Sequence, residues 1–359
     1  MTAKELAKII GVSEATMSLV LNRKPGISDR TRTKVEQKVR ELGYGDMIQN
    51  RDLHSEKNGG EAVPSTAANS GVIGFVLFEA GGELLGMNSF FPLILSGIED
   101  AVRKENCSLS VIRISKKNVE RELHYITDAG CRGYVIFATE MHEEDLEPFR
   151  RLGLPFVVFD NEFYDIPGFY TKVNNAQGSY LAIRHLYDKG HRKIGYLSSG
   201  LEIDSFKERE RSAFVAMTKL GIPFEDQQRF EIGYPHDNAY DGMMEVLASH
   251  KKTELPTAFF GDNDLVLVGA MRAMADSGYS IPDDFSLIGF DDRLECTLVN
   301  PQLTTIQLPR NRFGGVAIEQ LFDEISDPLL EGTTVEINGR LIERQSVADL
   351  STKGVRSED

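Results

Sequence analysis

The sequence lacks tryptophan and has only three cysteines, Cys107, Cys131 and Cys296, in 359 residues. These cysteines lie far apart and form no CxxC pair, so we expect neither a disulfide framework nor a metal site. No apolar run approaches the roughly 20 residues that a membrane-spanning helix needs. The first residues also lack the unbroken apolar stretch of a secretory signal. We therefore expect reduced cysteines in the core, no membrane association and a cytoplasmic location.

The common sequence signatures of catalysis are also missing. The chain contains no phosphate-binding P-loop, no GxSxG nucleophile elbow and no HExxH zinc motif. Its scattered aspartates suggest no paired general acid and base. We therefore expect that the chain is not an enzyme and uses no cofactor.

Positive charge is scarce in the chain as a whole, whose formal net charge is −15. Residues 1–53 are the exception, with ten Lys and Arg against seven Asp and Glu, which leaves −18 for the remainder. A basic segment attracts nucleic acid, whereas an acidic body repels it. This asymmetry indicates that any contact with nucleic acid is made by the N-terminal segment.

Residues 1–44 show the pattern of three short helices. Thr2, Ser13 and Ser28 are suited to cap them, and Gly11 permits a tight turn between the first two. Such a module is typical of helix-turn-helix DNA-binding domains, although a three-helix bundle without a DNA role would share the pattern. The residues expected to face inward are Leu6, Ile9, Ile10, Val12, Met17, Val20, Leu21, Val35, Val39 and Leu42.

The order of residues in this segment is more specific than its apolar pattern. It reads Gly11-Val12-Ser13-x-x-Thr16-Met17-Ser18-x-Val20-Leu21-Asn22, then Ser28-x-x-Thr31-Arg32-x-x-Val35 and Leu42-Gly43-Tyr44. In this order the segment resembles the LacI/GalR family of bacterial repressors. The resemblance implies that the second helix enters the major groove of a double-stranded DNA operator.

Two kinds of DNA contact follow from the resemblance. Glu14, Ala15 and Leu19 match positions that face base edges. Leu19 stands where an arginine is usual, so we expect a half-site that differs from the family's common one. The other expected DNA-binding residues of this domain, most of them matched to phosphate contacts, are Ser13, Thr16, Ser18, Asn22, Lys24, Ser28, Thr31 and Tyr44.

Residues 45–70 are expected to form a hinge and a flexible linker. In the family a short hinge helix wedges a leucine into the minor groove. Leu53 and Arg51 match that leucine and its arginine, but the usual proline, asparagine and alanine before them are missing. Residues 54–70 are polar and rich in Gly, Ser and Asn, which is typical of a tether.

Residues 71–350 alternate apolar strand patterns with amphipathic helical patterns, and residues 351–359 form a polar tail. The alternation predicts parallel sheets with helices on both faces, and its length suits two lobes. The expected strands are residues 72–78, 109–114, 134–138, 156–159, 193–197, 230–234, 258–261 and 286–290. The expected helices are residues 91–105, 119–129, 178–189, 206–220, 239–249 and 265–277.

This body resembles the same family over its whole length. The resemblance implies a small all-α helix-turn-helix domain followed by a periplasmic-binding-protein-like α/β sensor, with a ligand cleft between two lobes. The segments that carry it are Asn88-Ser89-Phe90-Phe91, Gly190-His191-Arg192-Lys193-Ile194, Asp262-Asn263-Asp264, Ile281-Pro282-Asp283-Asp284, Gly289-Phe290-Asp291-Asp292 and Leu303-Thr304-Thr305-Ile306.

Ligands of parallel α/β sheets bind at the carboxyl ends of the strands. Carboxylates and a guanidinium there suit the vicinal hydroxyls of a sugar, and aromatic faces suit its ring. The candidate effector-binding residues are Phe90, Phe91, Asp160, Arg209, Tyr234, Asn263, Asp264 and Asp291. Each also has a structural interpretation, such as core packing or helix capping. Arg211 is an alternative to Arg209, and we interpret His191 as structural.

We interpret the chain as a sequence-specific transcriptional regulator, a repressor that acts as a homodimer. A small-molecule effector, expected to be a carbohydrate, would control its affinity for the operator. The same architecture could instead answer to a purine or to a protein co-regulator. A solute-binding protein of a transporter would share the body but not the N-terminal module. Whether the effector releases or promotes DNA binding stays open.

Overall fold

The computed structural model describes residues 71–81, 91–223 and 228–351, together with residues 7, 10–13, 16, 17, 20, 31, 34, 35 and 38. By its internal contacts the chain divides into two units, residues 1–65 and residues 66–359. Ten of the predicted site residues lie outside the described residues. They are Glu14, Ala15, Ser18, Leu19, Asn22, Lys24, Ser28, Tyr44, Leu53 and Phe90.

The described residues of the first unit show a capped helical turn after a glycine. Gly11 has a φ of 79°, and its backbone N–H donates to the Ala7 carbonyl at 3.0 Å. The Ser13 hydroxyl accepts the Thr16 backbone N–H at 3.0 Å, which is an N-cap bond. The buried side chains are those of Ala7, Ile10, Met17, Val20 and Val35. Val12, expected in this core, is only half-buried.

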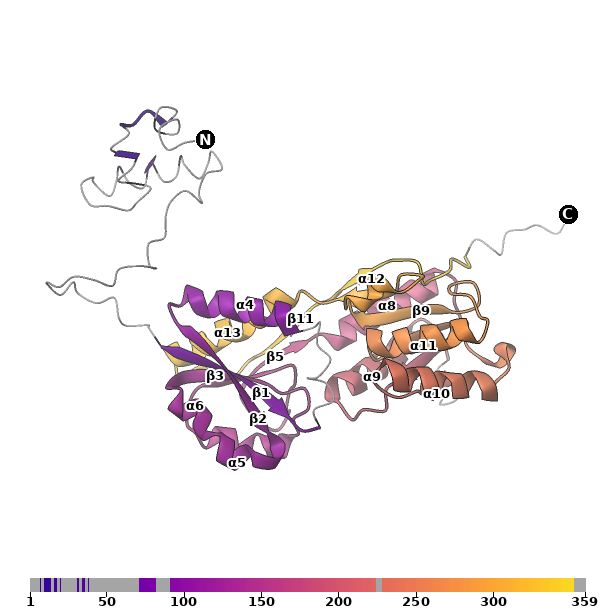
Figure 1. The fold of residues 1–359 in the computed structure, drawn as a ribbon, viewed down its shortest axis with the longest axis horizontal. Helices are drawn as coiled ribbons and strands as arrows, with labels where there is room; N and C mark the ends of the chain where they lie inside the picture. Colours follow the sequence, from indigo (N-terminus) through magenta and orange to yellow (C-terminus); the bar gives the residue numbers. More distant parts are fainter. Residues whose placement is uncertain are drawn as a thin grey trace. The chain divides into compact units, whose positions relative to one another are not determined.

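The second unit contains two six-stranded sheets (Figure 1). The first sheet is parallel throughout and has the order β11-β5-β4-β3-β1-β2. Its strands are β1 (Val72–Glu79), β2 (Ser108–Ser115), β3 (Cys131–Phe137), β4 (Phe156–Phe159), β5 (Phe169–Val173) and β11 (Thr334–Ile337).

The second sheet has the order β12-β10-β9-β8-β6-β7, and only β12 is antiparallel to its neighbour. Its strands are β6 (Ile194–Ser198), β7 (Arg229–Glu231), β8 (Ala258–Gly261), β9 (Ser286–Asp291), β10 (Thr304–Gln307) and β12 (Arg340–Ile342). Each sheet with its helices forms one lobe. We call the lobe of the first sheet lobe 1 and that of the second sheet lobe 2.

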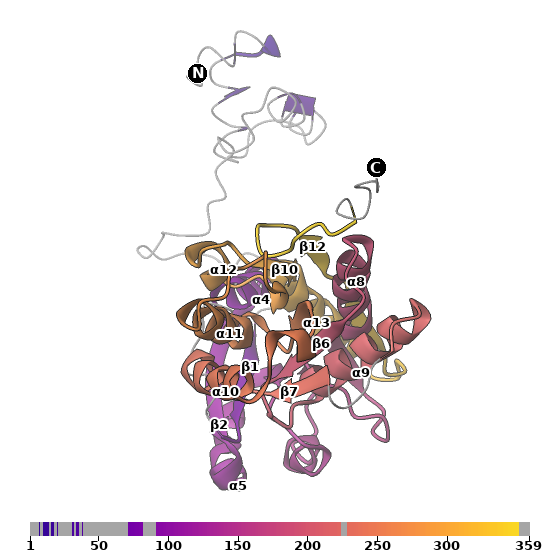
Figure 2. The ribbon, with the colours of Figure 1, turned by 90° about the vertical axis from the view of Figure 1, so that its right-hand side faces the viewer.

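Helices cover both faces of each sheet. In lobe 1, α4 and α13 lie on one face, and the short helices α5 and α6 lie on the other (Figure 1). The short helix α7 packs on the same face as α5 and α6. In lobe 2, α8 and α9 lie opposite α10 and α11 (Figure 2). The bounds are α4 (Phe91–Lys104), α5 (Val119–Glu122), α6 (His124–Asp128), α7 (Glu147–Arg150), α8 (Asn175–Asp188), α9 (Asp204–Lys219), α10 (His236–Ser249), α11 (Asp264–Asp276), α12 (Glu295–Leu298) and α13 (Arg310–Ser326).

Alternation along the strands explains why both faces are covered. On β1, Phe75 packs with α4 and α13, whereas Val76 packs on the face of α5 to α7. Because both faces are buried, the strands read as apolar runs in the sequence. None of the described helices has the length and apolar character needed to cross a membrane.

The chain passes between the lobes three times, at residues 173–175, 308–309 and 338–339. The first and third crossings are joined by hydrogen bonds. The Asn174 backbone N–H donates to the Ile337 carbonyl at 3.0 Å, and its side chain donates to Asn338 Oδ1 at 2.9 Å. Several short connections that lie side by side form a hinge, about which two rigid lobes can rotate.

Several expectations about single elements were wrong. The predicted helix over residues 119–129 is two short helices, and the strand predicted over residues 230–234 is β7, at residues 229–231. Cys131 and Cys296 are buried, but Cys107 is half-buried rather than in the core. The sequence interpretation also missed four strands, β5, β10, β11 and β12, and three helices, α7, α12 and α13.

The missed strand β5 is buried along its whole length although it contains Thr171 and Lys172. Both polar side chains have partners: Thr171 donates to Gln320, and Lys172 pairs with Glu162. Helix α13 contains Gly314 and Gly315, which lower intrinsic helix propensity, and it is held by packing instead.

Close packing between α4 and α13 depends on glycine. A Cβ on Gly314 would lie 2.5 Å from the Ile94 carbonyl oxygen, and a Cβ on Gly97 would lie 2.0 Å from the Asn311 carbonyl oxygen. The neighbouring Gly315 is different, because its Cβ would meet only the Gly97 carbonyl oxygen, at 3.8 Å. The two adjacent glycines of α13 therefore provide a matched pair.

We predict that Gly314→Ala lowers the free energy of unfolding by about 1–3 kcal/mol, because the added methyl group overpacks the helix pair. Gly315→Ala should be neutral or stabilise by about 0.5–1 kcal/mol, through helix propensity. Thermal and urea unfolding of the two variants measure the difference. Equal effects at the two positions would contradict the close contact between α4 and α13.

Candidate functional site

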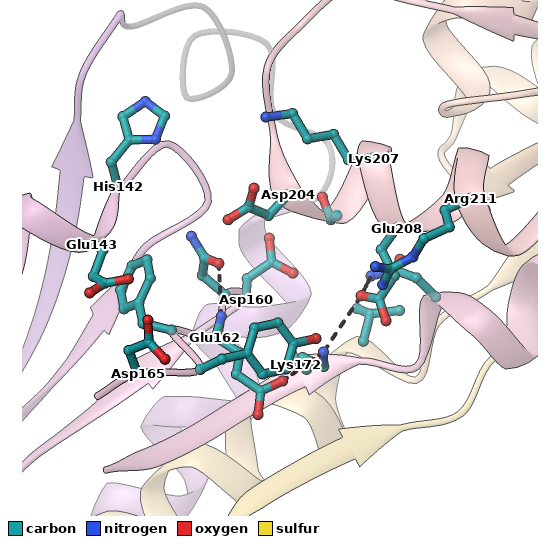
Figure 3. Close-up of a pocket in the computed structure, with 16 residues that line it drawn as sticks. His142, Glu143, Asp160, Glu162, Asp165, Lys172, Asp204, Lys207, Glu208 and Arg211 are labelled. Carbon is teal, nitrogen blue, oxygen red and sulfur yellow. Dashed lines mark hydrogen bonds and ion pairs between the residues drawn. The ribbon is translucent and has the colours of Figure 1, made fainter. Parts of the chain in front are cut away.

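Two cavities lie between the lobes, each lined by residues from both lobes. The smaller one, which we call the inner cavity, has a volume of about 60 Å³. The larger one, which we call the outer cavity, has a volume of about 440 Å³ (Figure 3). The two share Asp160 and Ser205 as lining residues. Most of the lining follows the carboxyl ends of strands, as expected for α/β sheets.

The inner cavity brings together six of the eight candidate effector residues, which come from separate parts of the chain. They are Phe91, Asp160, Arg209, Tyr234, Asn263 and Asp291. Asp264 does not line either cavity, and Phe90 lies outside the described residues. Of the two candidate arginines, Arg209 lines the inner cavity, whereas Arg211 is exposed and lines the outer one.

The guanidinium of Arg209 lines the inner cavity, and only 4% of the residue is exposed. It donates to the Asp262 carbonyl at 2.6 Å, to Asn175 Oδ1 at 2.9 Å and to Asp291 Oδ1 at 3.3 Å. It also stacks on Phe290, with its central carbon 3.8 Å from the ring centroid. These contacts fix the plane of the guanidinium before any ligand arrives.

Two carboxylates approach this cavity from opposite lobes. Asp160 follows β4 of lobe 1 and Asp291 ends β9 of lobe 2. Both have positive φ values, 67° and 104°, an uncommon conformation that is often found at functional sites. Thr139 Oγ1 donates to Asp160 Oδ2 at 2.5 Å. Their carboxylate oxygens can accept hydrogen bonds from ligand hydroxyl groups.

Burial raises the pKa of Asp160 to about 6. The hydrogen bond from Thr139 and the charge of Arg209 oppose this rise, whereas the Asp291 carboxylate adds to it. Burial likewise raises the pKa of the Tyr234 hydroxyl. The inner cavity therefore holds negative charge at a cost, which a hydroxyl-bearing or cationic ligand would reduce.

Asp264 has a supporting position behind the cavity. Its carboxylate accepts the Thr305 hydroxyl at 2.6 Å and the Arg293 backbone N–H at 2.8 Å. Burial, together with the nearby Asp291 carboxylate, raises its pKa to about 7. Its contacts fix the loop that follows β9 and carries the residues around Asp291.

The outer cavity is bordered by an ion cluster that joins the lobes. Lys172 Nζ lies 2.8 Å from a Glu162 carboxylate oxygen and 3.6 Å from oxygens of Glu208 and Glu336. Glu208 belongs to lobe 2 and the other three residues to lobe 1; Figure 3 shows the two contacts to Glu162 and Glu208. Burial opposes the charged form of Lys172, but the Glu162 hydrogen bond and the nearby carboxylates outweigh it, so its pKa is raised.

Sequence reasoning missed five residues of the inner cavity. Thr139 and Arg293 follow strands that the sequence did predict, so an inspection of strand ends would have found them. The missed lining residues are Phe137, Thr139, Ser205, Phe206 and Arg293.

His191 is buried and lies within hydrogen-bond distance of Thr257 Oγ1 and the Ala348 carbonyl, which fits its structural interpretation.

Residues 2–45 match the family model of bacterial regulatory proteins of the lacI family. Residues 183–347 match that of the periplasmic binding protein-like domain. Among curated relatives, a protein named HTH-type transcriptional repressor PurR from Erwinia tasmaniensis is 30% identical, and the match covers 97% of each chain. A protein of the same name from Mannheimia succiniciproducens is 28% identical over 98% of this chain and 99% of its own.

Solved structures show the same architecture. A complex of the transcriptional regulator CelR with cellobiose superposes with a TM-score of 0.68 at 21% identity, over 96% of this chain and 99% of the other. A lac repressor dimer bound to operator and the anti-inducer ONPF superposes with a TM-score of 0.67 at 22% identity, over 97% of this chain and 99% of the other. A LacI family regulator from Enterococcus faecium with bound ribose has a TM-score of 0.64 at 26% identity, over 78% of this chain and 99% of the other.

These matches extend over both the N-terminal module and the two lobes. The fold, a helix-turn-helix domain followed by two parallel α/β lobes, is the one that the sequence predicts. The chain belongs to the LacI family of bacterial DNA-binding regulators, whose binding to DNA is controlled by a small molecule.

Proposed function

We propose that the chain is a repressor whose operator affinity is set by a sugar or sugar derivative bound between the lobes. The observation that carries this proposal is the buried guanidinium of Arg209 beside Asp291 of its own lobe, with Asp160 facing the same cavity from lobe 1. Such a set donates and accepts hydrogen bonds at once, as vicinal hydroxyl groups require. We assign it a binding role rather than a catalytic one.

The aromatic lining also suits a sugar. Phe91, Phe206 and Tyr234 can cover the apolar faces of a sugar ring while the charged groups take its hydroxyls. Structures of similar fold contain ribose and cellobiose. A purine is the second candidate, because the same aromatic rings could stack on a planar base and the curated relatives are named PurR.

The small volume of the inner cavity couples binding to movement of the lobes. Ligand sites usually measure roughly 300–1,000 Å³, whereas this cavity has about 60 Å³. A sugar ring can enter only if the lobes move apart around the three crossings. The effector therefore selects a different angle between the lobes, which is the requirement for control of a distant site.

A hydrogen-bond network connects the inner cavity to a crossing. Arg310, at the start of α13, donates to the Asp291 carbonyl at 2.6 Å. The neighbouring Asp292 accepts from Arg344 at 2.6 Å and from Gln307 at 2.5 Å. Gln307 is the last residue of β10, directly before the second crossing. A shift of Asp291 on ligand binding would thus reach the connection between the lobes.

We infer that the protein acts as a homodimer in the cytoplasm, with its two reader helices in successive major grooves of a near-palindromic operator. Exposed apolar side chains next to and within α12, Leu294 at 62% and Leu298 at 73% exposure, support a self-association surface. A change in the angle between the lobes would alter the spacing of the two readers.

The direct test is selection of operator DNA from a random pool. The full chain should enrich a near-palindromic site, and a chain that lacks residues 1–53 should enrich none, because the reader is gone. A thermal-shift screen of sugars and nucleobases then identifies the effector, since a ligand at 100 times its Kd stabilises by about 2.7 kcal/mol. Specific selection by the shortened chain would overturn the proposal.

Asp160→Asn tests the charge that faces the cavity. The folded protein binds more protons than the unfolded chain between the ordinary pKa of 3.8 and about 6, so the carboxyl group makes stability fall as pH rises through this window. The substitution should therefore stabilise by roughly 1–3 kcal/mol at pH 7.5 and by little at pH 4. It should also weaken effector binding at least tenfold. Unfolding curves at both pH values and calorimetric titration measure these effects.

Equal stabilisation at both pH values would contradict an ionised Asp160 whose pKa is raised in the folded protein. Unchanged effector affinity would remove this carboxylate from the binding site.

Asp292→Ala tests the route between the sites. The substitution leaves every lining residue of the inner cavity in place, so we expect the effector Kd to change less than threefold. The effect of the effector on operator affinity, typically 5- to 150-fold in allosteric proteins, should fall to less than half its wild-type value. Fluorescence anisotropy with labelled operator measures it. An unchanged effect would exclude Asp292 from the coupling, and loss of effector binding would make its role structural.

A further inference from the structure

The outer cavity is large enough to bind a second part of the effector. Its volume of about 440 Å³ lies within the usual range of small-molecule sites, roughly 300–1,000 Å³. Because Asp160 and Ser205 line both cavities, a ligand bound at Asp160 can extend into the outer cavity without leaving the cleft.

The charged lining of the outer cavity is mainly acidic. Its carboxylates are Glu143, Asp160, Glu162, Asp165, Asp204 and Glu208, against the three cations Lys172, Lys207 and Arg211. Figure 3 shows Glu143 and Asp165 of lobe 1 on the side of the cavity opposite Asp204 and Lys207 of lobe 2.

Two of the three cations are engaged by glutamates. Lys172 lies within 2.8 Å of Glu162, and Lys207 lies 2.7 Å from Glu202. In the described part of the chain, Glu143, Asp165 and Asp204 have no ion-pair partner within 4 Å. Of the lining cations only Arg211 has no ion pair among the described residues, so a phosphate group would face three unpaired carboxylates against one such cation. This excess of like charge disfavours its binding.

An exposed aromatic side chain completes the lining. Tyr164 is 78% exposed although it is a large aromatic residue, and Lys172 Nζ lies 5.9 Å from the centre of its ring. Its ring offers an apolar platform beside carboxylates that accept hydroxyl groups, a combination that suits a second sugar ring.

We propose that the outer cavity is a second subsite, which binds the outer unit of an uncharged or cationic glycoside and excludes phosphorylated effectors. The inner unit is held at Arg209 and Asp160, so this inference rests on the proposed sugar effector. The effector would then be a disaccharide or another glycoside, in preference to a free monosaccharide or a sugar phosphate.

Calorimetric titration of the full chain with matched ligands tests the inference. The first set contains glucose, glucosamine, glucose 6-phosphate, cellobiose and maltose. The second set contains ribose, ribose 5-phosphate, adenosine and hypoxanthine. In the set that binds, we expect the glycoside to bind at least tenfold tighter than its monosaccharide. We expect the phosphate ester to bind at least tenfold weaker than its parent sugar.

Two variants assign these differences to the outer cavity. Tyr164→Ala, at an exposed position, should weaken glycoside binding at least fivefold and leave the monosaccharide unchanged. The parent sugar is expected to bind tighter than its phosphate ester, and Asp204→Asn should reduce the ratio of these two affinities at least threefold. The control is Asp283→Asn. Asp283 is exposed and lies just before the amino end of β9, whereas the cavities lie at the carboxyl ends of the strands. This substitution should change neither the affinity for the glycoside nor the affinity for the phosphate ester.

The outcomes separate the two proposals. If monosaccharide and glycoside bind equally and Tyr164→Ala alters neither, the outer subsite is wrong while the sugar effector stands. Tighter binding of a phosphate ester than of its parent overturns the charge selection. If hypoxanthine binds and no sugar or glycoside does, the sugar effector and the subsite are both wrong.

Discussion

The pairing of the buried Arg209 guanidinium is the interaction on which the proposed effector site depends. A buried charge is costly unless it is paired and hydrogen-bonded. Here Asp291, the Asp262 carbonyl and Asn175 supply the partners, and they come from β9, the end of β8 and the start of α8. Asn175 is the last residue of the first crossing between the lobes. The same guanidinium therefore orders the inner cavity and connects it to the first crossing, about which we propose that the lobes rotate.

The carboxylates in the cleft lower the stability of the folded protein, and the proposed binding of a ligand explains why they are there. Asp160 and Asp264 both have pKa values raised mainly by burial, and the Asp291 carboxylate raises both further. Asp160 and Asp291 also adopt positive φ values that most side chains avoid. Strained backbone and buried like charges are typical of binding sites whose ligand supplies the missing donors. Asp264 has another use, because it holds the loop after β9 in place.

Much of the architecture could be predicted from the sequence, since apolar runs and helical periodicity are local signals. Asp160 and Asp291 could be found because they follow predicted strands. Lys172 could not, since a lysine argues against a buried strand until its partners Glu162 and Glu208 are known from the tertiary structure. Whether Asp264 or Asp291 meets the cavity was equally hidden, because both follow strands and only packing decides which side chain is covered.

We propose that an effector in the inner cavity changes the angle between the lobes. Spin labels at Lys117 of lobe 1 and Glu202 of lobe 2, both exposed and both beyond the carboxyl ends of strands, report on this angle. The measurement is the distance between them by double electron–electron resonance, in labelled protein diluted with unlabelled protein. The ligand with the largest thermal shift should lengthen this distance. An unchanged distance at saturating ligand would contradict the account.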